Sequence, residues 1–247
     1  MNETQPYDFV SDLANRIEGW ACIPKLQVER LVGPILAMFL EEIMNVLFKI
    51  PANSPDPIRL IAPEWPLKKD GNNSSENIDW LMIQPINKIL YFIELKTATD
   101  SKDDLQRKTY QELAVRVKDN SAEFLISDID SIKNGTKKRH KYDKLLELVM
   151  PYRNYFKEIY DIRIIYIVPS KLKDGLEEAG VQVFSLKELP ECIPGEKQAV
   201  WSVLRAAFCA IDVPRLEYGK VRTSDNKGPV SLSKVALEIK ARPKMNS

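Results

Sequence analysis

The segment of residues 78–97 constrains the fold of this chain more than any other. Two apolar runs, rich in Ile, Leu, Tyr and Phe, flank a short polar break, and this pattern predicts a β-hairpin. With Ile86 and Asn87 as the two-residue loop, counting outward places Asp79 directly opposite Glu94. Directly opposed residues share a face of the sheet, with Cβ atoms about 4.5–5.5 Å apart. The hairpin therefore brings two carboxylates together on strands that are otherwise almost entirely apolar.

Lys96 adds a positive charge to this pair. It lies two residues beyond Glu94, so it points to the same side of the sheet, about 6–7 Å along the strand. Two neighbouring carboxylates repel each other and lose solvation unless a positive charge lies between them. A divalent metal with oxygen ligands, Mg²⁺ or Mn²⁺, would supply that charge, and Lys96 would then stabilise a phosphate or orient an attacking water. The alternative is a buried Asp–Lys–Glu salt bridge, and the triplet alone does not separate the two.

Composition limits the class of protein. The chain has 247 residues, 44% of them hydrophobic, so a substantial core is expected. Its formal net charge of +1 gives no overall positive field that would indicate a nucleic-acid partner. A local basic groove is still compatible with this net charge. The single histidine argues against histidine-based triads and His-rich metal sites. Three scattered cysteines predict reduced thiols in an intracellular, cytoplasmic protein. The N-terminus does not resemble a signal peptide. The sequence contains no run of about 18 apolar residues, so no membrane span is expected.

The remaining segments predict an α/β fold. Residues 161–169 form a near-continuous apolar run, typical of a strand covered on both faces. A short helix at 171–179 and a strand at 181–186 complete a βαβ unit, which implies a partly parallel sheet. Residues 58–67 predict a strand whose two prolines indicate either an edge position or a bent end. Helices are expected at residues 7–19, 34–50, 99–118, 142–160 and 201–212, and a short mixed segment is expected at 121–132.

Acidic residues outside the hairpin give further candidates. In the helix expected at 34–50, Glu41 lies opposite the apolar stripe and is interpreted as a solvated charge. Glu42 lies on the edge of that stripe, where a carboxylate either reaches into a site or extends to water. Glu64, in the strand before the hairpin, either approaches the same site or pairs with a lysine such as Lys68.

Polar residues after the hairpin give two further candidate regions. Gln106 and Tyr110 are spaced i, i+4 in the helix expected at 99–118, so they share one face. Residues 133–141 form a basic run that includes Lys137, Lys138 and Arg139. Such a run is either a solvated loop or a loop that contacts phosphate groups.

Asp79 followed by Glu94-Leu95-Lys96 across a hairpin resembles the signature of the PD-(D/E)xK nuclease superfamily. A helix with an acidic edge precedes the hairpin, and a Gln-x-x-x-Tyr helix, Gln106 to Tyr110, follows it. This order is similar to the RecB-type and phage-exonuclease branch of the superfamily. The resemblance covers roughly residues 34–190 and implies a restriction-endonuclease-like core, with a central mixed β-sheet flanked by helices. One departure is Ile78, which stands where the superfamily often has proline.

The resemblance also implies roles for individual residues. Asp79 and Glu94 would bind Mg²⁺, with Mn²⁺ as a substitute and the Leu95 carbonyl as an additional ligand. Lys96 would serve the attacking water and the scissile phosphate, and Gln106 and Tyr110 would position the site or contact the substrate backbone. Glu42 would be the helix-borne acid that many members use, with Glu64 as the secondary candidate, and Lys137, Lys138 and Arg139 would contact nucleic acid.

The expected function is metal-dependent hydrolysis of phosphodiester bonds, most directly in DNA. The alternatives are a nuclease-fold module without catalysis that binds nucleic acid or a partner protein, and an unrelated α/β protein with a structural salt bridge. The expected organisation is a helical extension at 1–33, a nuclease-like domain at 34–220 and a polar tail at 221–247. No membrane partner is expected, and self-association or a partner protein is left open.

Overall fold

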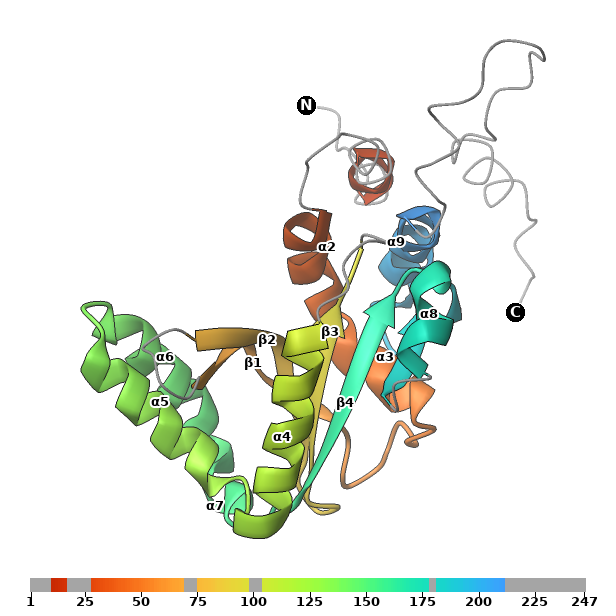
Figure 1. The fold of residues 1–247 in the computed structure, drawn as a ribbon. Coiled ribbons are helices and arrows are strands. Elements are labelled where there is room, and N and C mark those ends of the chain that lie inside the picture. The colour runs from red at the N-terminus through yellow and green to blue at the C-terminus, as the bar shows by residue number, and fades with distance from the viewer. Residues whose placement is uncertain (1–9, 17–27, 69–74, 98–103, 178–180, 212–247) are drawn as a thin grey trace, which may run out of the picture.

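A computed structural model shows an α/β protein built on one mixed β-sheet, and it describes residues 10–16, 28–68, 75–97, 104–177 and 181–211 (Figure 1). The sheet has five strands in the order β1-β2-β3-β4-β5. The strands are β1 (Arg59–Lys68), β2 (Ser75–Gln84), β3 (Ile89–Leu95), β4 (Asp161–Val168) and β5 (Gln182–Ser185). The expected class, a mixed sheet flanked by helices, is therefore confirmed.

The sheet is antiparallel in its first half and parallel in its second. The β1–β2 and β2–β3 pairs are antiparallel, whereas the β3–β4 and β4–β5 pairs are parallel. Helix α8 (Ser170–Glu177) connects β4 to β5, so the predicted βαβ unit is confirmed. The proline-containing β1 is at the edge of the sheet, as predicted, because proline has no backbone N–H to donate to a neighbouring strand.

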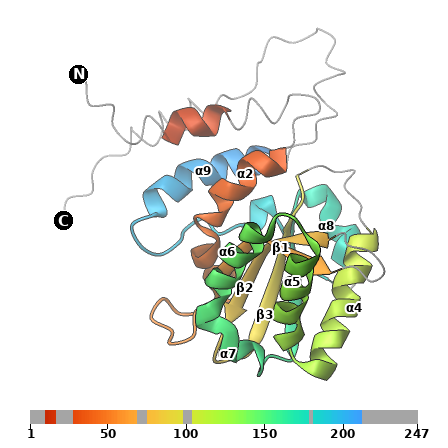
Figure 2. The same cartoon turned by 90° about the vertical axis from the view of Figure 1, so that its left-hand side faces the viewer.

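Each face of the sheet carries its own hydrophobic core (Figures 1 and 2). Helices α2 (Val28–Ala37), α3 (Leu40–Leu47) and α9 (Gln198–Ile211) contribute to one core, with buried residues that include Leu36, Leu40 and Trp201. Helices α4 (Asp104–Asn120), α5 (Glu123–Gly135) and α6 (Arg139–Val149) contribute to the other. The strands alternate between the two cores: Tyr91 and Ile93 of β3 belong to the first, whereas Leu90 and Phe92 belong to the second. This alternation fixes the face on which each polar residue of β3 lies.

The helix predicted at 34–50 is wrong in its bounds. Pro34 lies inside α2 and does not begin the helix. A proline in a helix interior removes one backbone hydrogen bond and crowds the preceding turn. Just after it, Met38 and Phe39 donate to carbonyls three residues back, at 3.2 and 3.0 Å, and α3 begins at Leu40. The boundary drawn between residues 33 and 34 is therefore not a packing boundary, since Val32 is fully buried in the first core.

Two further segments differ from the prediction. Residues 121–132 are mostly helical and belong to α5, whose Leu125, Ile126 and Ile129 are buried at helical spacing. The helix predicted at 142–160 is divided, because α6 ends at Val149 and a 3₁₀ turn that contains Pro151 leads into α7 (Arg153–Phe156). Proline again interrupts a helical pattern that the apolar spacing alone would have continued. The expected helix 7–19 is described only at 10–16, and the expected tail 221–247 lies outside the described residues.

Candidate active site

The β2–β3 hairpin has the predicted register. Gln84 pairs with Ile89, and the pairing continues to Trp80 opposite Ile93. Asp79 and Glu94 are the next residues beyond this last pair, and the charge of Glu94 contributes to raising the pKa of Asp79, so the two carboxylates lie close together. At the turn, the Asp56 carboxylate accepts hydrogen bonds from two backbone N–H groups of the loop, at 2.8 Å each. The local turn and the register of the hairpin together bring the two carboxylates close to each other.

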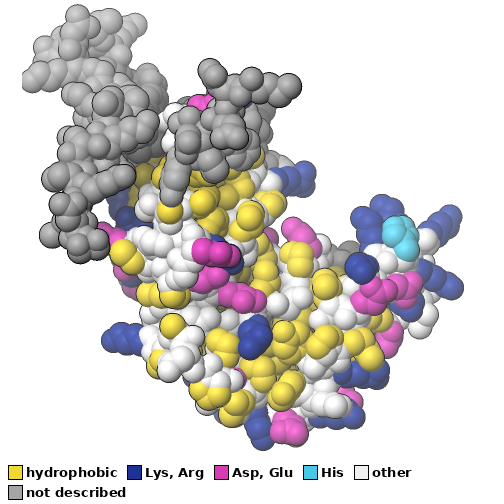
Figure 3. All heavy atoms as spheres, turned by 180° about the vertical axis from the view of Figure 1, so that it is seen from behind, with side chains coloured by type: hydrophobic (Ala, Val, Ile, Leu, Met, Phe, Trp, Pro, Cys, Tyr) yellow, Lys and Arg dark blue, Asp and Glu magenta, His cyan; other side chains and the backbone are white. Residues whose placement is uncertain are grey.

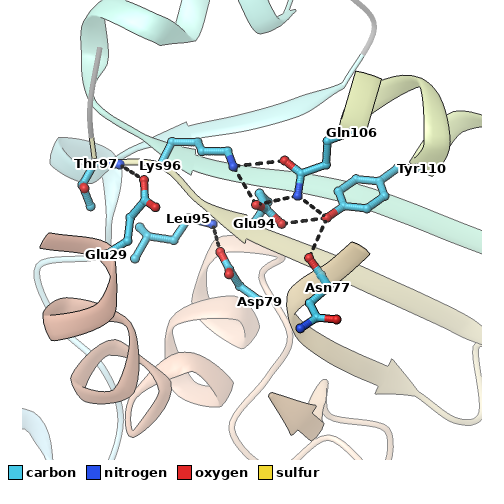
Figure 4. Close-up of polar contacts among 9 residues, drawn as sticks. All are labelled: Glu29, Asn77, Asp79, Glu94, Leu95, Lys96, Thr97, Gln106 and Tyr110. Atoms are coloured by element: carbon cyan, nitrogen blue, oxygen red, sulfur yellow. Dashed lines mark hydrogen bonds and ion pairs between the residues drawn. The ribbon is translucent and has the colours of Figure 1, made fainter. Parts of the chain in front are cut away.

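Glu94 is the centre of a buried polar cluster (Figure 4). Its Oε1 accepts hydrogen bonds from Lys96 Nζ at 2.8 Å and from Gln106 Nε2 at 2.9 Å. Its Oε2 accepts a hydrogen bond from the Tyr110 hydroxyl at 2.9 Å. Glu94 is only 3% exposed, so this carboxylate depends on protein donors in place of water.

Gln106 and Tyr110 reach the cluster from one face of α4. The Gln106 amide donates to the Tyr110 hydroxyl at 2.7 Å, and its Oε1 accepts from Lys96 Nζ at 3.0 Å. The predicted i, i+4 relation of these residues is therefore confirmed, and both are buried. The proposed capping residues of this helix, Asp100 and Ser101, lie outside the described residues. Helix α4 thus holds a Gln–Tyr pair against the carboxylate of Glu94 and the ammonium of Lys96.

Asp79 lies beside this cluster with little compensation for its charge. Its Oδ2 accepts a hydrogen bond from the backbone N–H of Leu95 at 2.7 Å. Burial, and next the nearby Glu94 carboxylate, raise the pKa of Asp79 to about 7. Burial also raises the pKa of Glu94, although Lys96, Tyr110 and Gln106 oppose that change. Two partly desolvated carboxylates therefore share the positive charge of Lys96.

The remaining groups of the cluster keep their protons. Burial by itself lowers the pKa of Lys96, but the Glu94 carboxylate more than offsets this, so that the pKa is raised overall. Burial and the adjacent Glu94 raise the pKa of the Tyr110 hydroxyl. Lys96 is thus an ammonium and Tyr110 a neutral hydrogen-bond donor across the ordinary pH range. Both are suited to stabilising negative charge, and neither is suited to act as a general base.

The helix-borne acid at this cluster is Glu29, which the sequence pattern did not indicate. Glu29 lies in the first turn of α2, and its Oε1 accepts a hydrogen bond from the backbone N–H of Thr97 at 3.0 Å (Figure 4). Its charge also contributes to raising the pKa of Lys96. The signal in the sequence was weak, because Glu29 precedes the strong apolar pattern that was used to place the helix.

Glu42, the predicted helix-borne acid, has a different partner. Its Oε1 forms a salt bridge with Lys197 Nζ at 2.7 Å. Its Oε2 is buried and has no hydrogen-bond partner among the residues that the structure describes. Because α3 begins a new helix after Pro34 and Met38, the face that carries Glu42 meets the segment before α9 and not the end of β3. The structure therefore does not join Glu42 to the Glu94 cluster.

Glu64 and the basic run are brought near the site to different degrees. Glu64 lies between the pairs Pro63–Trp80 and Trp65–Ile78, so it is opposite Asp79, and its charge contributes to raising the pKa of that residue. It is exposed, with a left-handed φ of 52°. The suggested pairing with Lys68 is not present: Lys68 donates to Ser131, and Glu64 accepts from Asn77 at 3.2 Å.

Lys137, Lys138 and Arg139 lie away from the Glu94 cluster. They occupy the loop between α5 and α6 and the first residue of α6, and all three are exposed. The structure therefore brings together Asp79, Glu94, Leu95, Lys96, Gln106 and Tyr110, with Glu64 at the margin.

The donor set of the cluster fits a hard divalent cation. Among the residues described, no group of three or more His, Cys, Asp and Glu side chains is placed to hold a metal ion. Mg²⁺, however, is usually bound by one or two carboxylates together with water and substrate phosphates. Asp79 and Glu94 provide only oxygen atoms, and burial together with the neighbouring Glu94 charge raises the pKa of Asp79. The side chains present are therefore compatible with Mg²⁺ or Mn²⁺ and unsuited to a softer metal.

Comparisons with known proteins do not identify a relative. No family model, no curated protein and no solved structure matches this chain. Within the described part of the chain, none of the helices has the length and apolar character needed to span a bilayer.

Proposed function

We propose that this protein is a metal-dependent nuclease that hydrolyses phosphodiester bonds, with DNA as the substrate. The observation that carries the proposal is the proximity of Asp79, Glu94 and Lys96 at the end of the β2–β3 hairpin, with Gln106 and Tyr110 hydrogen-bonded to this group. This arrangement supports the resemblance to the PD-(D/E)xK superfamily. The antiparallel β1–β2–β3 unit, followed by α4 and the parallel β4, supports a restriction-endonuclease-like core of the RecB-type or phage-exonuclease branch.

Asp79 and Glu94 would hold the cation, with the Leu95 carbonyl as a further oxygen donor. Bound Mg²⁺ would polarise the phosphate and lower the pKa of a water molecule to generate the nucleophile. Asp79 is the residue most available for this task, because the hydrogen bond from Leu95 occupies only one of its two carboxylate oxygens. Neutralisation of Asp79 at acidic pH would weaken metal binding.

Lys96 would offset the negative charge that develops on the phosphate. Its ammonium is positioned by Glu94 and Gln106 at 2.8 and 3.0 Å, and its raised pKa keeps it charged. A positioned cation in a partly desolvated site stabilises developing charge more than it would in water. Gln106 and Tyr110 would act as positioning residues, since they fix the Glu94 carboxylate and the Lys96 side chain.

Glu29 replaces Glu42 as the proposed helix-borne acid. The hydrogen bond from Thr97 ties the start of α2 to the chain directly after Lys96. A carboxylate held there lies beside the Asp79, Glu94 and Lys96 cluster, whereas the Glu42 carboxylate is paired with Lys197.

The pattern of free thiols at Cys192 and Cys209 supports a cytoplasmic location for such an enzyme.

One observation favours the alternative, a nuclease-fold module without catalysis that binds nucleic acid or a partner protein. Glu94 already accepts three hydrogen bonds from Lys96, Gln106 and Tyr110. These three donors already compensate the charge of Glu94 without a metal ion. The cluster would then serve to stabilise the fold. The presence of the less compensated Asp79 beside it is the argument for the catalytic proposal.

A cleavage assay tests the proposal directly. The purified protein is mixed with plasmid and with linear duplex DNA in Mg²⁺, in Mn²⁺ or in EDTA. We expect cleavage with either metal and none in EDTA. Asp79→Asn and Lys96→Ala should each reduce the rate at least about 100-fold, and Lys96→Arg should restore only part of it, because a planar guanidinium differs from a compact ammonium.

Lys88→Ala is the matched control for Lys96→Ala. Lys88 is an exposed lysine at the hairpin turn, paired with Glu158 on the surface, so its removal should leave cleavage at the wild-type rate. Cleavage by Lys96→Ala or Asp79→Asn at the wild-type rate, in protein shown by circular dichroism to be folded, contradicts the catalytic proposal. So does the absence of cleavage by wild-type protein with every metal and both DNA forms.

A further inference from the structure

The loop between α5 and α6 carries an uncompensated positive charge. We call residues 137–141 the basic tip; all of them are exposed. Lys137, Lys138, Arg139 and Lys141 have no ion-pair partner within the part of the chain that the structure describes. Figure 3 shows dark-blue Lys and Arg side chains around the cyan histidine at one corner of the molecule, with magenta acidic side chains beside them.

Some exposed lysines of this protein are instead paired with acids. Lys88, Lys108 and Lys144 pair with Glu158, Glu112 and Glu147 respectively. The contrast cannot be explained by the overall composition, because acidic and basic residues are nearly equal in number, at 35 and 36. Exposed cations elsewhere, such as Lys49, Lys118 and Lys171, also have no ion pair among the described residues, but they are isolated along the chain, whereas the basic tip gathers four cations within five residues.

The position of these cations is unfavourable for the fold itself. Arg139 begins α6, whose first turn contains no acidic residue, and the N-cap residue Lys138 makes no side-chain capping hydrogen bond. Cations at the N-terminal end of a helix oppose the helix dipole, and adjacent like charges repel each other. Residues that cost stability without an internal partner indicate an external one.

The basic tip lies at the same end of the molecule as the Glu94 cluster. Helix α5 packs against the edge strand β1, and Lys68 at the end of β1 donates a hydrogen bond to Ser131 of α5. Lys68 pairs with Ser75, four residues before Asp79 on β2, or about 13 Å along the strand. In both ribbon views the α5–α6 loop lies level with the start of α4, where Gln106 is located (Figures 1 and 2).

The side chains of the basic tip select phosphate groups and not bases. The five residues include no aromatic side chain other than the imidazole of His140, and the neighbouring Tyr142 is partly buried against the second core. Proteins that hold single strands combine charge with several aromatic residues on which successive bases stack. Charge without such a stacking platform or a groove-reading element gives binding to the backbone that is independent of sequence.

We propose that the basic tip binds the sugar–phosphate backbone of a DNA duplex whose scissile phosphate lies at the Asp79, Glu94 and Lys96 cluster. A duplex is stiff over tens of base pairs, so a phosphate held at the tip fixes the position of phosphates at the cluster. This inference rests on the proposed nuclease function for the identity of the ligand. It adds that the substrate is double-stranded and is bound without sequence preference.

Salt dependence of binding tests the proposal. Full-length protein is titrated onto a fluorescent duplex of about 30 base pairs and arbitrary sequence in EDTA, between about 50 and 200 mM salt, and the dissociation constant is measured by anisotropy. The test variant is Lys137→Gln/Lys138→Gln/Arg139→Gln. Its slope of log affinity against log salt should be shallower by about 0.9 for each phosphate that the variant no longer neutralises, or about 2–3 in total. Its affinity at about 100 mM salt should fall at least about 10-fold.

The matched control removes the same charge from elsewhere on the surface. Lys88→Gln/Lys108→Gln/Lys157→Gln neutralises three exposed lysines that are paired with acids and lie outside α6. Its slope should stay close to that of wild type. An equal weakening of binding in the two triple variants shows that only net charge matters, and an unchanged slope in the tip variant shows that the tip does not bind phosphate; each result overturns the proposal. Binding of wild type to single strands but not to the duplex overturns it as well.

The outcome is separable from that of the cleavage assay. Wild-type protein that binds the duplex through the tip but cleaves nothing supports the basic tip and contradicts the nuclease proposal. Wild-type protein that cleaves DNA while the tip variant keeps a normal salt slope supports the nuclease and overturns the tip. Because the substituted residues are exposed, melting temperatures of all three proteins should agree within a few degrees, which confirms that the variants are folded.

Discussion

The charges of the Glu94 cluster are buried and paired, whereas those of the basic tip are exposed and have no ionic partner among the described residues. In the cluster, Lys96 and Glu94 are mostly buried, with side-chain exposures of 14% and 4%, and are joined at 2.8 Å. In the tip, residues 137–141 are exposed and have no ionic partner among the described residues. The cluster fixes atoms at defined positions, which chemistry requires, whereas the tip provides a field, which attracts a ligand without fixing it. A single protein that contains both has the parts expected of an enzyme that binds a large polyanion and reacts at one point on it.

Removing one cation from each region tests whether the two regions contribute differently to stability. Lys96→Ala should lower the free energy of unfolding by about 2–4 kcal/mol, because it leaves Glu94 buried without its ionic partner. Lys138→Ala should change it by less than about 0.5 kcal/mol, since exposed substitutions have small effects. Urea denaturation of both variants measures these values. Similar decreases in the two variants would show that the proposed difference between cluster and tip is wrong.

The pH dependence of stability sharpens the description of the cluster. The pKa of Asp79 is raised to about 7 in the folded protein, above its ordinary value of 3.8. The folded state therefore holds a proton that the unfolded state releases, and stability should fall as pH rises from about 4 to about 7, then level off. Asp79→Asn removes this penalty, so its gain in stability over wild type in EDTA should grow through the same interval to about 1–3 kcal/mol at about pH 8.

Melting curves in EDTA at about pH 4, 6 and 8 measure this dependence, with Glu64→Gln as the control for a more exposed acid on the adjacent strand. Added Mn²⁺ should raise the melting temperature of wild type at about pH 8 and not that of Asp79→Asn, because a ligand stabilises only the state that binds it. A decrease in the stability of Asp79→Asn at that pH, together with no metal response in wild type, would show that Asp79 is part of a structural ion pair.

The smallest expected effect separates stability from binding in the basic tip. Lys138 is the N-cap residue of α6 and makes no capping hydrogen bond. Lys138→Asp supplies a capping carboxylate and a favourable charge at the helix N-terminus, so it should raise stability by about 0.5–1 kcal/mol. The same change should weaken binding to duplex DNA. Thermal melts and anisotropy titrations of this variant test both effects, and a variant that is stabilised but binds DNA as wild type does argues against the tip.

Several parts of the site could be predicted from the sequence because they depend on local periodicity. The proximity of Asp79 and Glu94 follows from a short turn and the register of the hairpin. The contact between Gln106 and Tyr110 follows from their i, i+4 spacing on a helix. Both relations are set by backbone geometry over a few residues, so no knowledge of the rest of the chain was needed.

Only the tertiary structure decided which distant groups meet at the end of β3. The sequence favoured Glu42, whereas the structure brings Glu29 to Thr97 and pairs Glu42 with Lys197. The interruption after Pro34 divides one predicted helix into two, and the direction of each is set by packing against the sheet. The hydrogen bonds that Glu94 accepts from Gln106 and Tyr110 likewise depend on how α4 packs against the sheet. The position of α5 depends on how that helix packs against β1. Local spacing determines the direction in which a side chain points on its own element, but the burial of apolar surface between elements determines what it finds there.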